Sequence, residues 1–262
     1  TKGIAIATAV LAATALFVGI LAFAECGRRI GTARLARDPE GLSKGTSAAE
    51  GAVFALLGLM LAFSFSGAAS RFEARRILVA EEANHIGTAW LRLDMLPADA
   101  QPPLRALFRQ YLDVRLATSR DSRNNDEHLA HLEAAEALQA RIWTSTVAVC
   151  KRPDTMTQAA VVVLPAVNNM SDITTTRLLA TENHPPPVVF VMMALLGLVS
   201  ALLMGYASSA NRDRSVLHTG IFAAVLSLTF YVIIDLEFPR FGIIRVDAAD
   251  QVLVELRASM GE

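Results

Sequence analysis

The sequence lacks most of the features that mark a soluble enzyme or a secreted disulfide scaffold. Its two cysteines, Cys26 and Cys150, are too few for a disulfide framework. It contains no glycine-rich phosphate loop, no nucleophile elbow and no His-Glu-x-x-His motif, so we expect no enzymatic activity. A net charge of −1 provides no basic surface for nucleic acid, and we expect no nucleic-acid partner.

Long apolar runs are what the sequence has instead. Hydrophobic residues make up 53% of the chain, and they concentrate in runs of the length that crosses the hydrocarbon core of a bilayer. These runs are residues 3–24, 51–70, 188–208 and 215–236. The sequence therefore predicts an integral membrane protein with four transmembrane helices and the lipid bilayer as its surroundings. Segments of alternating polarity, which would indicate a transmembrane barrel, are absent from it.

The block between the second and third runs, residues 71–186, has helical periodicity with charged opposite faces. Its expected helices are 71–95, 103–119, 126–150 and 154–183, the last of them interrupted near Pro165. The three consecutive prolines at 185–187 stop the preceding helix and suit the start of the next one. The pattern predicts a helical bundle outside the membrane.

The fold class expected from these patterns is an all-α, four-span membrane protein with the bundle inserted between spans two and three. Four spans place both termini and the bundle on one side, and the loops 25–50 and 209–214 on the other. The expected division is 1–70 for spans one and two, 71–186 for the bundle, 187–238 for spans three and four, and 239–262 for a C-terminal segment that packs on the bundle.

Span two continues into charged sequence without a proline or a turn signal, as the stretch LLGLMLAFSFSGAASRFEARR at 56–76 shows. Small residues follow one another at spacings of three and four, a pattern that lets helices approach closely. They are Gly51, Ala55, Gly58 and Ala62.

If several copies of span two surround a symmetry axis, Leu59 and Phe63 would form rings that gate a pore by dewetting. Aromatic edges carry the positive part of the ring quadrupole and tolerate an anion better than a cation. The alternative is that both side chains face lipid or a neighbouring helix.

Ionisable residues at the span ends are further candidates. Glu50 would lie at the pore entrance, where a ring of glutamates disfavours anions; alternatively, it only complements the dipole at a helix N-terminus. We also expect ion pairing between the ends of spans two and four. The residues concerned are Arg71, Arg75, Asp235 and Glu237.

A metal site in the bundle is a further possibility. Glu82 and His85 form a Glu-x-x-His pair of the kind found in di-iron bundles. His128 and His131 can share a helix face and bind a metal. A second Glu-x-x-His is missing, so solvated polar faces are favoured, and we expect neither a metal nor a cofactor.

Several stretches resemble known membrane families. The run GLMLAFSFSGAASRFEAR at 58–75 resembles the second span of bestrophins, and IDLEFPRFG at 234–242 resembles the segment after their last span. Over nearly its full length the chain resembles the bestrophin-like family of bacterial membrane proteins. The blocks that carry this resemblance are EEANHIGTAWLRLDMLP, LRALFRQYLDVRL and FGIIRVDAADQVLVELRASM.

Bestrophins are pentameric anion channels with a narrow neck lined by the second span. The resemblance places the neck at Ala55, Leu59 and Phe63, although Ala55 is small where a bulky residue is expected. The acidic residues after span four are scattered, so a calcium clasp is not expected.

The resemblance implies a homopentameric channel that passes inorganic anions such as chloride, in the bacterial inner membrane, with the bundle and both termini in the cytoplasm. The competing interpretation is a non-conducting scaffold or sensor whose bundle binds a protein or a small ligand.

Overall fold

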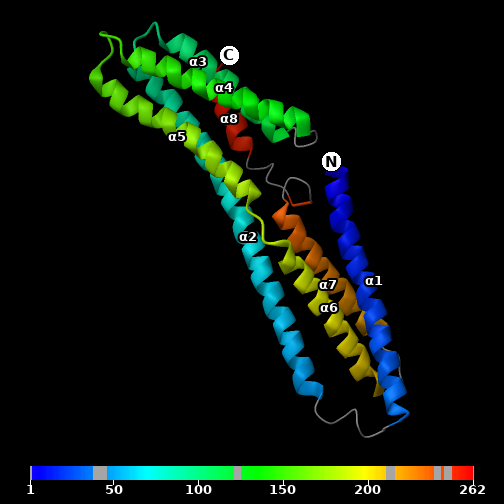
Figure 1. Cartoon of the computed structure of the whole chain (residues 1–262). Helices are drawn as coiled ribbons and strands as arrows, with labels where there is room; N and C mark the ends of the chain where they lie inside the picture. The colour runs from blue at the N-terminus through cyan, green and yellow to red at the C-terminus, as the bar shows by residue number, and fades with distance from the viewer. Residues whose placement is uncertain are drawn as a thin grey trace. The chain divides into compact units, whose positions relative to one another are not determined.

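The computed structural model of the chain describes residues 2–37, 46–120, 125–210, 216–238, 243–244 and 250–261 (Figure 1). Within these residues the regular secondary structure is helical, so the predicted all-α fold is confirmed. The helices are α1 (Lys2–Leu35), α2 (Thr46–Arg92), α3 (Gln101–Arg120), α4 (Asn125–Cys150), α5 (Thr157–Glu182), α6 (Pro187–Ala207), α7 (Val216–Glu237) and α8 (Gln251–Ser259). Two 3-10 turns, η1 (Leu93–Met95) and η2 (Ser208–Ala210), follow α2 and α6.

The prediction of four membrane spans is also confirmed. Among the described residues, four helical stretches are long and apolar enough to cross a membrane, and their apolar parts belong to α1, α2, α6 and α7. The third span begins where the sequence indicates, because α6 has a proline at its first position and the preceding Pro186 is extended.

Helix α1 is longer than the sequence suggested. The expected loop from residue 25 is wrong over residues 25–35, because α1 continues to Leu35. An ion pair between Arg29 Nε and Glu25, one turn apart at 2.9 Å, supports this polar extension, and no proline interrupts it. The first predicted loop is also wrong over residues 46–50, because α2 begins at Thr46. Residues 38–45 and 211–214 of the two predicted loops, and residue 215 at the predicted start of span four, lie outside the described residues.

Helix α2 is a single helix of 47 residues, and Figure 1 shows it without a break. The predicted passage from apolar to charged sequence within one helix is therefore confirmed. It contains no proline, so each backbone N–H along it is available for the helical hydrogen bonds.

The chain divides into two compact units, and their boundary falls inside α2 between Ser70 and Arg71. One unit, the bundle unit, contains residues 71–183 and 244–262, together with the first two residues. The other, the span unit, contains residues 3–70 and 184–243.

In the span unit, α1 and α6 cross with their backbones close together. A Cβ atom added to Gly205 of α6 would overlap the carbonyl of Ala24, and one added to Gly27 of α1 would overlap the carbonyl of Leu202. Gly31, one turn beyond Gly27, lies against Ser209 and the carbonyl of Tyr206. Small residues four apart are the usual means of such an approach in membranes. By contrast, an added Cβ at Gly51 or Gly58 of the predicted strip on α2 meets no described residue within 4 Å.

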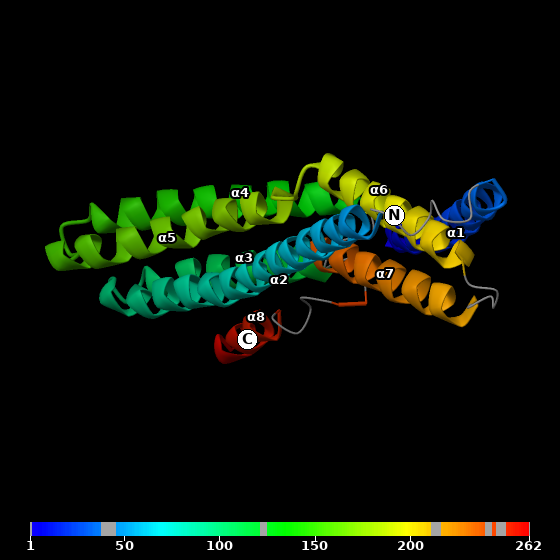
Figure 2. The same cartoon turned by 90° about the horizontal axis from the view of Figure 1, so that it is seen from below.

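The bundle unit has a continuous apolar core formed by α3, α4, α5, α8 and the C-terminal half of α2. Figure 2 shows α3, α4 and α5 running alongside this half of α2. Its largest fully buried side chains include Ile86, Phe108, Tyr111, Ile142 and Met170. At about 1.5–3 kcal/mol for each buried large apolar side chain, this core is the main source of stability of the unit.

The short helix α8 completes this core. Leu253 is fully buried in it, and Arg257 binds the Asp113 carboxylate of α3 through two nitrogens at 2.7 and 3.2 Å. Nearby, the buried Trp90 has the guanidinium groups of Arg105 and Arg109 over its ring, 4.8 and 5.5 Å from the centroid. Helix α8, in the predicted C-terminal segment, thus packs on the bundle, whereas Ile243 belongs to the span unit, and residues 239–242, 245–249 and 262 lie outside the described residues.

Helix α5 passes through Pro165, so the expected interruption there is wrong. A proline inside a helix costs about 3 kcal/mol, because it removes one hydrogen bond and crowds the preceding turn. Two features compensate. Val163 and Ala166, on either side of the proline, are buried in the core, and Arg92 Nη1 donates a hydrogen bond of 2.9 Å to the carbonyl of Val162 in the crowded turn.

We predict that Gly205→Ala destabilises the span unit by about 1–3 kcal/mol, the usual cost of overpacking, because the new methyl group meets the Ala24 carbonyl. Gly220→Ala on α7 is the matched control, since an added Cβ there meets nothing within 4 Å. It should be neutral or slightly stabilising, because alanine favours helix. Thermal unfolding of the detergent-solubilised protein measures both effects, and equal midpoints for the two variants would contradict the close crossing.

Candidate functional site

The predicted pore residues lie on one face of the membrane-spanning half of α2. Ala55, Leu59 and Phe63 succeed one another at intervals of four residues, and all three are exposed. The exposed fractions of Leu59 and Phe63 are 53% and 70%. Between residues 48 and 70, only Leu57 and Ala68 are buried. The span unit therefore leaves this face of α2 open to lipid or to another chain, and a role in a pore stays a prediction.

Glu50, the predicted entrance residue, is half-buried near the start of α2. Its Oε1 atom is enclosed and has no hydrogen-bond partner among the described residues. Because α2 begins at Thr46, Glu50 lies beyond the first turn, where the effect of the helix dipole has mostly fallen away. A favourable interaction with the N-terminus of the helix therefore explains the position of Glu50 less well than the sequence suggested.

Arg75, at the start of the bundle unit, binds two backbone carbonyls of the same unit. It is buried, and it donates from Nε to the carbonyl of Ala180 and from Nη2 to that of Asn183, both at 3.0 Å. These carbonyls lie at the C-terminal end of α5, where helical carbonyls lack partners. A cation is favourable at this end of a helix.

The acidic residues that end α7 form contacts within the span unit. Both oxygens of Asp235 accept the N–H of Ile243, at 3.0 and 3.1 Å. The buried Glu237 lies 3.6 Å from Nδ1 of His184, whose ring stacks on Phe238 at a centroid distance of 4.6 Å. These contacts fix the backbone at the end of span four. The expected pairing of Asp235 and Glu237 with Arg71 and Arg75 stays a prediction.

A buried ion cluster lies in the bundle unit. Glu82 of α2 has no exposed surface, and its Oε1 accepts a hydrogen bond from Nε of Arg115 on α3 at 2.6 Å. Its Oε2 pairs with Nη1 of Arg177 on α5. Both arginine side chains are almost enclosed, 10% and 11% exposed. Charge-assisted hydrogen bonds of this kind are the strong ones, so this carboxylate ties three helices together.

A second set of polar contacts crosses the same bundle. Nε2 of Gln139 on α4 donates to the hydroxyl of Tyr111 on α3 at 3.0 Å and to that of Thr174 on α5 at 3.2 Å. Burial raises the pKa of the Tyr111 phenol, while the nearby Arg115 and the hydrogen bond from Gln139 act in the opposite direction. Because the net shift is upward, the phenol is neutral at physiological pH.

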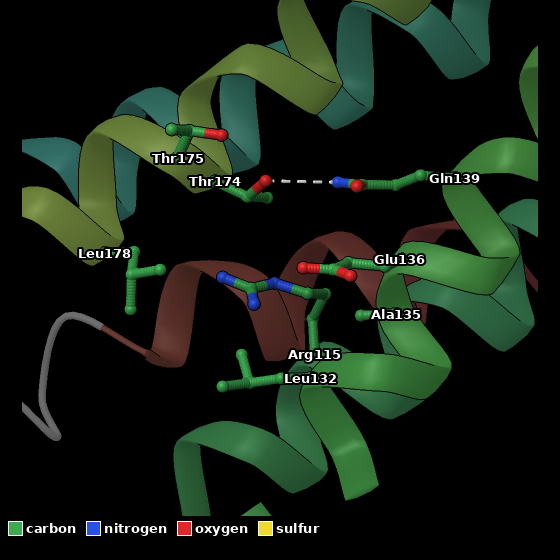
Figure 3. A pocket seen from close by; sticks show the side chains of 8 residues that line it. All are labelled: Arg115, Leu132, Ala135, Glu136, Gln139, Thr174, Thr175 and Leu178. Atoms are coloured by element: carbon green, nitrogen blue, oxygen red, sulfur yellow. Dashed lines mark hydrogen bonds between the residues drawn. The ribbon is translucent and has the colours of Figure 1, made fainter. Parts of the chain in front are cut away.

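A pocket opens beside these two sets of contacts, between α3, α4 and α5 (Figure 3). Its lining residues are Arg115, Leu132, Ala135, Glu136, Gln139, Thr174, Thr175 and Leu178. Glu136, Thr175 and Leu178 are exposed at its rim, whereas Ala135 is buried. The bundle therefore offers a partly enclosed site with one guanidinium, one carboxylate at the rim, several neutral polar groups and an aliphatic wall.

The sequence interpretation missed this cluster, because it considered Glu82 only as half of a metal motif with His85. A different signal was present. Glu82 occupies the same helical stripe as Val79 and Ile86, and Arg115 continues the apolar stripe of Tyr111 and Leu112. A charge inside an apolar stripe on each of two helices indicates a buried ion pair.

Within the described part of the chain, no three His, Cys, Asp or Glu side chains are arranged to hold a metal ion. The candidate ligands His85, His128 and His131 are thus not brought together as a ligand set there.

We predict that Glu82→Gln lowers the stability of the bundle unit by about 3–5 kcal/mol, because two enclosed guanidinium groups lose their shared carboxylate. Glu81→Gln removes the same charge from the exposed neighbouring position and should change stability by less than about 0.5 kcal/mol. Denaturant unfolding of the solubilised protein compares the two variants. Similar losses for both would mean that total charge, rather than the buried cluster, determines the effect.

Comparison with known proteins gives one family match. The model of the Bestrophin-like domain matches residues 28–250, a range that starts within α1 and ends just before α8. No curated protein and no solved structure matches the chain. The match covers most of the chain and includes α2 to α7, and it agrees with the resemblance seen in the sequence blocks. The chain is a member of the Bestrophin-like family, with several helices suited to a membrane.

Proposed function

We propose that this protein is a homo-oligomeric ion channel that conducts anions, with α2 lining the pore. The observation that carries the proposal is the open face of α2, on which Ala55, Leu59 and Phe63 are exposed along the membrane-spanning half. A pore built from several copies needs a span whose axis-facing side is uncovered in the single chain. Membership of the Bestrophin-like family adds weight, because bestrophins are channels of this kind.

The proposed gate is apolar. Rings of Leu59 and Phe63 around the axis narrow the pore and expel water, which blocks ions until the rings widen. The edges of the Phe63 rings present partial positive charge, so a dehydrated anion is tolerated better than a cation. Ala55, one turn nearer the start of α2, would narrow the pore only slightly because its side chain is small. Glu50 would act at the entrance, and its charge would oppose anion entry.

The subunit number, the membrane, the ion and the side of the bundle are proposed from the resemblance to bestrophins. The assembly would be a pentamer in the bacterial inner membrane, chloride would be one of its ions, and the bundle would be cytoplasmic. No catalytic role is proposed. The alternative, a non-conducting sensor or scaffold, is favoured by a different observation, the polar pocket in the bundle unit.

The first test is the mass of the detergent-solubilised particle, counting protein only, by native mass spectrometry. We expect a closed ring of five chains, each of 28.1 kDa. A monomer or a dimer would exclude an axial pore lined by α2 and would favour the sensor interpretation.

We predict that Phe63→Ala and Leu59→Ala each increase the conductance or open probability several-fold in planar bilayer recordings, because a smaller ring is easier to wet. Phe65→Ala is the matched control. Phe65 is also exposed, but two positions along a helix turn its side chain away from the face of Phe63. An equal effect of Phe65→Ala, or no current from any variant in confirmed pentamers, would contradict a gate at these positions.

A further inference from the structure

The pocket between α3, α4 and α5 contains a guanidinium group that is only partly used. Arg115 donates from Nε to Glu82, and within the described residues its terminal nitrogens Nη1 and Nη2 donate to no protein acceptor. The side chain is only 10% exposed. The terminal nitrogens are not among the enclosed unpaired atoms of the described residues, so a ligand that enters the pocket can reach them. A charged donor of this kind forms strong hydrogen bonds with an anionic acceptor. We propose that the pocket binds a small aliphatic monocarboxylate through Arg115.

The orientation of the guanidinium favours a carboxylate. Because Glu82 occupies Nε, the free edge is the one that carries Nη1 and Nη2, and this edge forms a fork that matches the two oxygens of a carboxylate. The ion pair with Glu82 also holds the group in place before a ligand arrives, which lowers the entropy lost on binding. Figure 3 shows the Arg115 side chain extending into the pocket from α3, toward Leu178.

The remaining lining residues suit a short apolar tail and disfavour extra charge. Leu132, Ala135 and Leu178 provide an aliphatic wall, and Thr175 provides a hydroxyl at the rim. Glu136, exposed on the same rim, would repel a second negative charge, so a monocarboxylate is preferred over a dicarboxylate or phosphate. The amide nitrogen of Gln139 is already bonded to Tyr111 and Thr174, which leaves Arg115 as the principal ligand-binding group.

This inference is independent of ion conduction, since it concerns the bundle unit alone. A direct test is isothermal titration of acetate and propionate into the full-length solubilised protein at constant ionic strength, with chloride and phosphate as comparison anions. We expect saturable binding that is tighter for propionate than for acetate, and weak or no binding of chloride and phosphate. Absence of saturable carboxylate binding, or phosphate binding as tight as that of propionate, would overturn the proposal.

Variants locate the site. Thr175→Asp places a negative charge on the pocket rim without altering the Glu82 cluster, and it should weaken propionate binding at least about tenfold through repulsion of the carboxylate. Thr176→Asp adds the same charge at the next exposed position of α5, which does not line the pocket, and should change affinity by less than about threefold because solvent and salt screen it. Equal effects of both would place the ligand elsewhere.

Arg115→Lys provides a second variant. It keeps the charge beside Glu82 but replaces the fork with a single ammonium group. We expect carboxylate binding to be lost while the protein keeps its elution profile and most of its thermal stability. Should this variant fail to fold, the comparison of Thr175→Asp with Thr176→Asp still decides the question.

Discussion

Glu82 of α2 lies without solvent contact in the bundle unit, and its two oxygens bind Arg115 of α3 and Arg177 of α5. A buried carboxylate is tolerated only when positive partners and hydrogen bonds replace its hydration. This requirement fixes how the three helices are rotated about their own axes, since each must direct one charged side chain at the same point. The apolar core around the cluster then packs in one register rather than in several.

The same constraint connects the two properties of α2 that matter for function. Its C-terminal half is held in the bundle unit by Glu82 and by a buried stripe that includes Val79 and Ile86, whereas its N-terminal half leaves Leu59 and Phe63 uncovered. One helix therefore combines an anchored segment with a segment that another chain can cover. Such a division suits a subunit of an assembly, and it is the physical basis on which the proposed channel rests.

The fold was largely predictable from the sequence, and the candidate site was predictable in part. Long apolar runs and the lack of proline in α2 indicated the spans and the unbroken helix, because these depend on local composition. The strip of Gly51 and Gly58 indicated a face that other helices can approach closely, yet in the described part of the chain the tight approach is between α1 and α6, at Gly27 and Gly205. A small-residue pattern shows which faces can come together, but the pairing of helices depends on the whole unit. Glu82 was overlooked for a similar reason, since its partners lie on other helices.

The surroundings of Trp90 give the molecule a built-in optical reporter. The chain has two tryptophans, Trp90 and Trp143, and both belong to the bundle unit. Trp90 is buried with two arginine side chains of α3 over its ring, whereas Trp143 is exposed on α4. The tryptophan emission, excited selectively at the red edge of the absorption band, thus originates in the bundle unit, and a water-soluble quencher separates it into an accessible part from Trp143 and a shielded part from Trp90. Changes in the packing of α2 against the bundle can be followed in lipid vesicles without any attached dye.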